Sequence, residues 1–234
     1  MPDPPYWTSP NRVSFSFPNF PASDGGAASD YKWKVCISNG NCITDWIDYK
    51  GKDLTRSASI IDPESNEEII VSQLVHVVDT DLPIGITLSN GIEYSIKILG
   101  YNAAGVLNGV EVTSGNILAD TTKPSLPSGK SVYSGQYFSN VAAQVTPNGM
   151  GVSWDSFEDP ESGIQEYYFQ IFEYLKGSGV ESYIGSPQTP KIRAGGADEQ
   201  NVYASNLNLA PGKAYFARVT AVNGAGIQAS SYVL

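Results

Sequence analysis

The sequence is short of several residue types, and each shortage narrows what the chain can do. Its 234 residues include one histidine, two cysteines and two methionines. No apolar run approaches the roughly 18 residues of a membrane-spanning helix, so we expect no membrane span. The chain opens Met-Pro-Asp-Pro-Pro, without the basic and apolar regions of a signal peptide, and we expect that such a peptide is absent or already removed.

Basic residues are also scarce, with 14 Lys and Arg against 24 Asp and Glu and a net charge of −10. A nucleic-acid-binding surface needs a basic face to contact phosphates, so no nucleic-acid partner is expected. Residues 1–120 carry 15 acids and 7 bases, whereas residues 121–234 carry 9 acids and 7 bases. We interpret the acidic excess as a source of solubility and of repulsion between chains, with calcium binding as the alternative.

Catalytic chemistry has little to draw on in this sequence. The single histidine, His76, lies between valines, a pattern that favours a structural role on one face of a strand. A Ser-His-Asp triad would have to use His76, and the sequence has no Gly-x-Ser-x-Gly motif. One histidine and two cysteines do not make a zinc site, and no phosphate-binding glycine motif follows a strand. We therefore expect no enzymatic activity, no cofactor and no metal centre.

Carboxylates cluster in three places, and calcium at a loop or interdomain site is the functional interpretation of them. Solvated turn residues are the favoured interpretation, because none of the clusters has the EF-hand spacing. The clusters are Asp62/Glu64/Glu67/Glu68, Asp79/Asp81 and Asp155/Glu158/Asp159/Glu161.

The two cysteines, Cys36 and Cys42, flank a short polar stretch that contains Gly40. A three-residue hairpin loop with Gly40 in the left-handed region would place the cysteines opposite each other, which favours a disulfide over two free thiols. So small a ring stabilises by only about 2 kcal/mol in the chain-entropy model. A disulfide indicates an oxidising location.

One motif occurs twice with the same internal spacing. Residues 88–94 read LSNGIEY and lead to NAAG at 102–105, while residues 209–215 read LAPGKAY and lead to NGAG at 223–226. In both copies the Leu precedes the Tyr by six positions, and the last Gly follows the Tyr by eleven. The glycine of each turn supplies a positive φ at low cost, and alternation after each Tyr predicts a half-buried strand.

This motif resembles the E–F corner of fibronectin type III domains, the tyrosine corner of immunoglobulin-like sandwiches. The resemblance implies an all-β chain of two tandem β-sandwich domains, 1–120 and 121–234. Residues 120–124, Asp-Thr-Thr-Lys-Pro, are similar to the junctions of such tandem repeats. The resemblance also implies a set of fold-defining residues, which are Leu88, Tyr94, Trp154 (in the core of strand B), Leu209 and Tyr215.

The first domain is predicted to differ from the second at its start and in its middle. Residues 1–12 are rich in proline and can form at most an edge strand, so we expect this domain to lack a proper first strand. Tyr6 and Trp7 look exposed in this N-terminal segment. Residues 51–85 are longer than their counterpart and predict an inserted hairpin or widened sheet, with strands at 57–61 and 69–78.

A sandwich with a missing strand offers an unpaired edge to another chain, although a cut from a longer protein would explain the same asymmetry. The sequence therefore predicts a non-enzymatic extracellular structural protein, either the repeating subunit of a surface filament or fibril or part of an adhesin stalk. Other copies, joined head to tail, or neighbouring domains would be its partners. The assembly edge would be Tyr6, Trp7, Thr8, Tyr232, Val233 and Leu234.

Two other functions remain open at this point. One is a carbohydrate- or ligand-binding accessory module, with Tyr6, Trp7, Trp46 or Tyr49 stacking on sugars, although such aromatics more often fill cores or interfaces. The other is a receptor-like ectodomain fragment. The sequence contains no Asn-x-Ser/Thr site for N-glycans, whereas O-linked glycans on its many Ser and Thr stay open.

Overall fold

A computed structural model describes residues 6–19, 28, 30–61, 68–102, 107–136, 148–174, 184–187 and 189–232. The chain divides into two compact units, Met1–Thr121 (unit 1) and Thr122–Leu234 (unit 2). The division falls one residue from the predicted domain boundary at 120/121. In the described residues every regular element is a β-strand, and none of them forms a helix that could cross a membrane.

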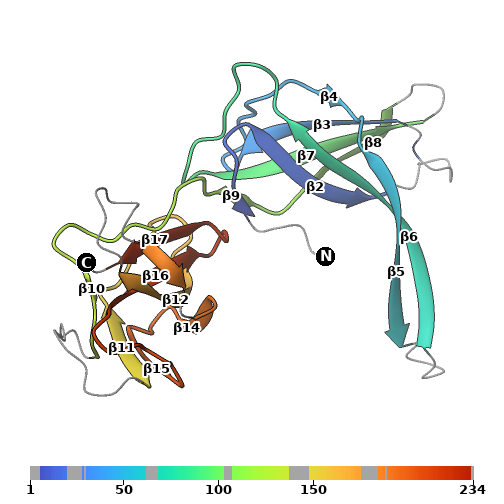
Figure 1. The fold of residues 1–234 in the computed structure, drawn as a ribbon. Coiled ribbons are helices and arrows are strands. Elements are labelled where there is room, and N and C mark those ends of the chain that lie inside the picture. Colours follow the sequence, from blue (N-terminus) through green and yellow to red (C-terminus); the bar gives the residue numbers. More distant parts are fainter. Residues whose placement is uncertain are drawn as a thin grey trace. The chain divides into compact units, whose positions relative to one another are not determined.

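Unit 1 is built from two sheets (Figure 1). The larger sheet has the order β1-β9-β7-β3-β4, with β8 also paired to β7, and the smaller sheet has the order β2-β6-β5. The strands of unit 1 are β1 (Tyr6–Trp7), β2 (Arg12–Pro18), β3 (Asp30–Ile37), β4 (Ile47–Asp48), β5 (Lys52–Ile61), β6 (Glu68–Asp81), β7 (Glu93–Tyr101), β8 (Leu107–Thr113) and β9 (Ile117–Ala119).

The core of unit 1 follows from the alternation of β2, β3 and β7. Val13, Phe15 and Phe17 of β2 point inward and meet Tyr31, Trp33 and Val35 of β3, and all six side chains are buried. The Trp33 ring lies edge-on to Phe15 with 5.3 Å between ring centroids. The alternation of residues 31–37 in the sequence predicts Tyr31, Trp33 and Val35 on the inner face of this strand, and that prediction is correct.

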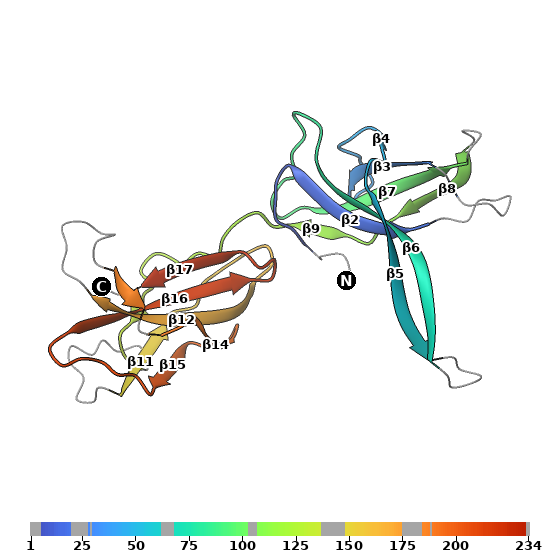
Figure 2. The same ribbon diagram turned by 45° about the vertical axis from the view of Figure 1, so that its right-hand side comes forward.

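The predicted insertion in the first domain is a β-hairpin formed by β5 and β6. The two strands pair without a register shift from Lys52↔Val77 to Ile61↔Glu68, whereas β2 pairs with β6 only as far as Pro18↔Val75. Figures 1 and 2 show the hairpin continuing beyond the end of β2. We call the part of β5 and β6 beyond Pro18↔Val75 the arm.

Unit 2 also contains two sheets, of orders β10-β11-β15 and β13-β12-β16-β17, with β14 also paired to β12. Its strands are β10 (Val132–Tyr133), β11 (Gly149–Trp154), β12 (Ile164–Tyr174), β13 (Ile184–Pro187), β14 (Ile192–Gly196), β15 (Asn201–Ser205), β16 (Ala214–Asn223) and β17 (Gln228–Tyr232). Trp154 is fully buried against Tyr167, with 5.3 Å between ring centroids.

Both tyrosine corners form as their sequence spacing implies. The Tyr94 hydroxyl accepts a hydrogen bond from Ser89 N (2.7 Å), and the Tyr215 hydroxyl accepts one from Ala210 N (2.8 Å). The turn glycines Gly91 and Gly212 have φ of 74° and 76°, a region that favours glycine. Leu88 and Leu209 are buried beside their corners.

The chain is therefore an all-β protein with fibronectin type III/immunoglobulin-like sandwiches. The two units differ in sheet composition. In unit 1 the strand before the tyrosine corner, β6, has a neighbour on each side, whereas in unit 2 the corresponding strand, β15, pairs only with β11 among the residues that the structure describes.

Candidate functional site: sheet edges and polar clusters

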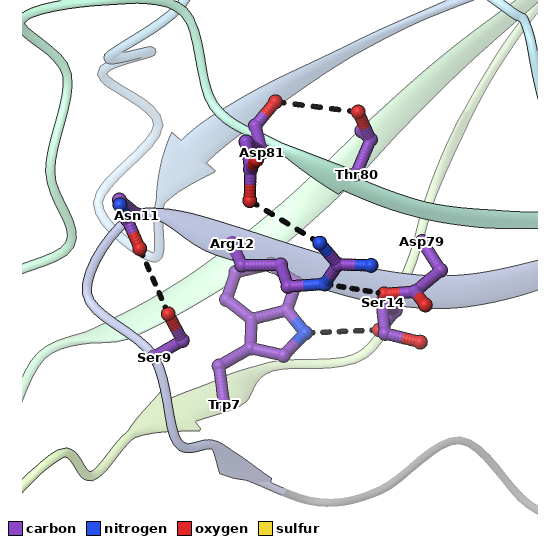
Figure 3. Close-up of polar contacts among 8 residues, drawn as sticks. All are labelled: Trp7, Ser9, Asn11, Arg12, Ser14, Asp79, Thr80 and Asp81. Carbon is purple, nitrogen blue, oxygen red and sulfur yellow. Dashed lines mark hydrogen bonds and ion pairs between the residues drawn. The ribbon is translucent and has the colours of Figure 1, made fainter.

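The N-terminal strand corrects the expectation that Trp7 is exposed. Tyr6 and Trp7 form β1, which pairs in parallel with Leu118 and Ala119 of β9. The Trp7 ring is 3% exposed, lies 6.2 Å from the Tyr94 ring, and donates from Nε1 to the Ser14 carbonyl oxygen (3.0 Å; Figure 3). Trp7 is a core residue because β1 extends the edge of the larger sheet over the start of β2.

The first unit thus has a first strand, although a short one, and it lies on β9. Of the other N-terminal residues predicted at an assembly edge, Tyr6 is half-buried and Thr8 is exposed. At the C-terminal end Tyr232 lies on the edge strand β17, 36% exposed, with its ring 5.9 Å from Phe216. Val233 and Leu234 lie outside the described residues.

The Asp79/Asp81 pair binds a cationic side chain of the protein itself, the guanidinium of Arg12. The Arg12 guanidinium donates to Asp79 (2.9 Å) and contacts Asp81 (3.3 Å), as Figure 3 shows. The hydrogen bond from Arg12 lowers the pKa of Asp79, and the same bond raises the pKa of Arg12. This arrangement ties β2 to β6 on the surface of unit 1.

His76 lies in an aromatic cage at the base of the β5–β6 hairpin. Its ring is buried beside Phe17, Tyr31 and Tyr49, with centroid distances of 5.0, 4.6 and 5.3 Å. Nδ1 lies 2.7 Å from an Asp53 carboxylate oxygen, and Nε2 is buried without a hydrogen-bond partner. The His76 ring therefore joins β5 to the core, as expected of a structural histidine.

Asp53 and Tyr49, which both lie beside His76, have shifted pKa values. The hydrogen bond from His76, followed by that from Tyr49, lowers the pKa of Asp53. Burial, followed by the hydrogen bond to Asp53, raises the pKa of Tyr49 to about 12. Tyr49 is half-buried, and its hydroxyl donates to an Asp53 carboxylate oxygen (3.0 Å).

The hairpin loop after β3 holds a disulfide between Cys36 and Cys42, and Gly40 has a φ of 97°. In the described part of the chain there is no free cysteine. Next to this loop the Lys34 ammonium lies 4.2 Å above the Trp46 ring centroid. The cation–π contact covers one face of Trp46, another aromatic predicted to stack on sugars.

The acidic cluster of unit 2 is divided among separate hydrogen-bond networks. Asp155 accepts from Ser131 N and the Tyr133 hydroxyl, both at 2.9 Å. These bonds, led by the one from Ser131, lower the pKa of Asp155. Asp159 is buried and accepts from Asn223 Nδ2 (3.0 Å), which ties the loop after β11 to the end of β16.

The remaining predicted acids are exposed, bonded locally or undescribed. Glu161 accepts from the Thr122 hydroxyl (3.0 Å), and Glu158 is exposed. In unit 1, Asp62, Glu64 and Glu67 lie outside the described residues, and Glu68 is described only through its backbone. Calcium binding at these acids stays the untested alternative to solvated turn residues.

Sequence reasoning missed two hollows and two free sheet edges. A hollow of about 410 Å³ in unit 1 is lined by Trp33, Ile47, Asp48, Lys50, Asp79 and Asp81, among others. A hollow of about 370 Å³ in unit 2 lies beside β15 and is lined mainly by apolar residues, including Phe169, Ile192, Val202, Tyr203, Ala204 and Leu207. In the described residues β5 and β15 each pair on one side only. Edge position depends on which strands neighbour each other in space, and alternation within one strand carries no signal for it.

Comparisons with known proteins assign no function to the chain. No family model matches the chain. A search of curated proteins also finds no match. Among solved structures, one match is the chicken CNTN1 FN1-FN3 domains, at 15% identity and a TM-score of 0.27, covering 97% of this chain and 63% of that one. The fold assignment therefore rests on the sheet orders and tyrosine corners of this chain.

Proposed function

We propose that the chain is a non-enzymatic structural subunit of an extracellular filament, fibril or adhesin stalk, with copies joined head to tail. The observation that carries the proposal is that both units present strands with one side unpaired among the described residues, among them β5 in unit 1 and β15 and β17 in unit 2. An unpaired edge is a ready template for a strand of another chain. Because such edges lie in both units, one copy can contact the next through different surfaces, which builds an open fibre when the rotation does not close.

Other features support an extracellular structural role. The Cys36–Cys42 disulfide suits an oxidising environment. The net charge of −10 limits nonspecific association, so that assembly depends on specific edges. The single histidine is enclosed by aromatic rings and an aspartate, and its Nε2 meets no hydroxyl or thiol partner in the described part of the protein. Tyr6, Thr8 and Tyr232 remain candidate contact residues.

Negative-stain microscopy beside size-exclusion chromatography tests the proposal on the purified full chain. Over a series of concentrations we expect regular filaments or a ladder of oligomers that grows with concentration. Dilution alone should reverse the assembly. A single monomer peak at every concentration, with no filaments on the grid, contradicts the proposal.

The hollow in unit 1 favours a second candidate, a ligand-binding accessory module. Its lining combines the Asp48 and Asp79 carboxylates with Lys50, groups that can hydrogen-bond a polar ligand. Trp33 is only 1% exposed, so its ring cannot stack on a sugar. A sugar is therefore a less suitable ligand for this hollow. A glycan array on the monomeric chain tests this function, and binding that survives Asp48→Asn would exclude the hollow as its site.

A further inference from the structure

We infer that the joint between copies is a strand pairing, in which the free edge of β5 in one copy adds to the free edge of β15 in the next. This inference rests on the proposed self-association and names the two surfaces that make it. It places the contact on the arm and on the apolar hollow of unit 2, away from the chain ends that the sequence indicated.

The first argument is the difference between equivalent strands of the two units. Both β6 and β15 precede a tyrosine corner, and each pairs with an earlier strand, β2 or β11, in which Val and Ser precede a buried aromatic residue, Phe15 or Trp154. In unit 1 the other side of β6 is occupied by β5. In unit 2 the corresponding side of β15 has no strand among the described residues, and the 370 Å³ hollow lies there. A strand like β5 therefore has a vacant equivalent position in unit 2.

The second argument is the distribution of exposed apolar side chains. Seven large apolar side chains are exposed in the described residues. Leu54 and Leu74 lie on the hairpin, at 47% and 39% exposure, and Ile192 and Tyr203 line the hollow, at 37% and 51%. Leu54 opposes Val75 and Leu74 opposes Thr55, so the two leucines point to opposite faces of the hairpin, and only Leu54 lies on the edge strand. Leu54, Ile192 and Tyr203, three of the seven, thus lie where the two surfaces would meet, and their contact would remove apolar area from water.

The third argument is that the arm lacks internal support. Beyond Pro18↔Val75 the hairpin is a two-stranded ribbon, and a ribbon of this kind is at best marginally stable in water. The sequence nonetheless places Ile60 and Ile61 at the end of β5 and Ile69 and Ile70 at the start of β6. Pairing along β5 with β15 of another copy would join the ribbon to the three-stranded sheet β10-β11-β15.

The hydrogen-bonding groups of the β5 edge can be assigned from register. In an antiparallel pair the N–H and C=O of one residue point to one side, and successive residues alternate. Asn19 N donates to Leu74 O (3.2 Å), so even-numbered residues of β6 face β2 and odd-numbered ones, such as Val75, face β5. Leu54 opposes Val75 and bonds to β6. Asp53, Thr55 and Ser57 therefore direct their backbone groups to the free edge.

The same reasoning applies to β15. Trp154 N donates to Gln200 O (2.9 Å), and the β11–β15 ladder continues without a register shift. Val202 and Ala204 consequently bond to β11. Asn201, Tyr203 and Ser205 direct their backbone groups outward. Each edge thus offers the backbone groups of three alternate residues, the pattern that an antiparallel partner requires.

Proline substitutions test the joint, because proline on an edge strand with an outward N–H is tolerated within the chain but cannot donate to a partner. Thr55→Pro should block the β5 edge and Tyr203→Pro the β15 edge, with Thr55→Ala and Tyr203→Ala as controls for the lost side chains. Ser230→Pro places the same change on β17, an edge strand that does not take part in the proposed joint. Circular dichroism melting of each variant confirms that it folds.

By sedimentation and microscopy, Thr55→Pro and Tyr203→Pro should each lower self-association by about tenfold or more, since each loses a backbone donor at the contact. Mixed one to one, they should form discrete dimers, because each retains the edge that the other lacks. The two alanine variants and Ser230→Pro should assemble. Assembly of either edge-blocked variant like the wild type, or loss of assembly in Ser230→Pro alone, overturns the joint and leaves the proposed function standing.

Hydrogen exchange on the unmodified chain gives a second measurement that no folding defect can affect. The amides of Thr55, Ser57, Tyr203 and Ser205 should exchange quickly in the monomer and become protected in the polymer. Polymers in which these amides exchange at the monomer rate contradict the joint but not the proposed function. A wild-type chain that stays monomeric at every concentration contradicts both.

Discussion

Unit 1 and unit 2 share the tyrosine corner but differ in the sheet that stands beside it. In unit 1 the smaller sheet is β2-β6-β5, and in unit 2 it is β10-β11-β15, so the strand before the corner is central in one unit and at the edge in the other. The large core tryptophan also changes place, from β3 (Trp33) to β11 (Trp154). A conserved corner geometry is thus compatible with different neighbours and different core layouts.

The difference indicates that the corner is stabilised locally. Each corner depends on a turn glycine with positive φ and one hydrogen bond that spans five residues, from Ser89 to Tyr94 or from Ala210 to Tyr215. Sheet composition depends instead on the path of the chain between the third strand and the corner. In unit 1 that path makes both strands of a hairpin, whereas in unit 2 it pairs β13 and β14 with β12 before reaching β15.

The largest effect should come from Trp33 and Trp154, the two least exposed tryptophans. Trp33→Ala and Trp154→Ala each leave a cavity at a site that is 1% or 0% exposed, and each should cost about 3–5 kcal/mol of unfolding free energy. If the units have separate cores, each change should lower the unfolding transition of its own unit in calorimetry and leave the other transition in place. A single shared transition that shifts equally for both variants would contradict this separation.

The disulfide distinguishes the units next, because among the described residues it belongs to unit 1 alone. The double change Cys36→Ala/Cys42→Ala should destabilise unit 1 by about 2 kcal/mol, the chain-entropy value for so short a loop. Chemical denaturation monitored by tryptophan fluorescence measures the loss, with and without reductant. The wild-type chain under reduction should match the double variant, and an equal loss in both units would show that the disulfide does not act locally.

The two tyrosine hydroxyls should differ modestly in how much unfolding free energy each contributes to its unit. Tyr94→Phe removes the acceptor of Ser89 N at a ring that is only 2% exposed, whereas Tyr215, the acceptor of Ala210 N, is half-buried. We expect about 1–2 kcal/mol for Tyr94→Phe and about half that for Tyr215→Phe, because water can replace the lost acceptor more easily in unit 2. Matched denaturation curves measure both, and a larger loss for Tyr215→Phe would reverse the ranking of the corners.

The sequence was sufficient for everything that depends on local pattern. Alternation placed Tyr31, Trp33 and Val35 inside, and the repeated spacing placed Tyr94 and Tyr215 at corners. It failed for Trp7, because a proline-rich N-terminal segment with two aromatic residues looks exposed until β9 is known to lie beside it. The free edges of β5 and β15 were missed for the same physical reason, since pairing between distant strands is a property of the assembled sheets.

The smallest effect compares two aspartates whose pKa values are lowered by different partners. Asp155 in unit 2 accepts a backbone hydrogen bond from Ser131 and its side chain is 16% exposed, whereas Asp53 in unit 1 accepts from His76 and is 57% exposed. Because a lowered folded-state pKa stabilises the charged form, each contribution is present above the unfolded pKa of about 3.9 and is lost as the pH falls through the folded value.

Asp155→Asn should therefore destabilise unit 2 at pH 7 more than Asp53→Asn destabilises unit 1, where solvent screens the exposed carboxylate and the loss should stay under about 1 kcal/mol. Both differences from the wild type should shrink as the pH falls below the unfolded value of about 3.9 and the wild-type carboxylates become protonated. Denaturation curves at pH 7, 4 and 2.5 measure them. A difference that does not change with pH would mean that the side-chain amide disturbs packing rather than removing a charge, and the electrostatic distinction between the units would then fail at these two residues.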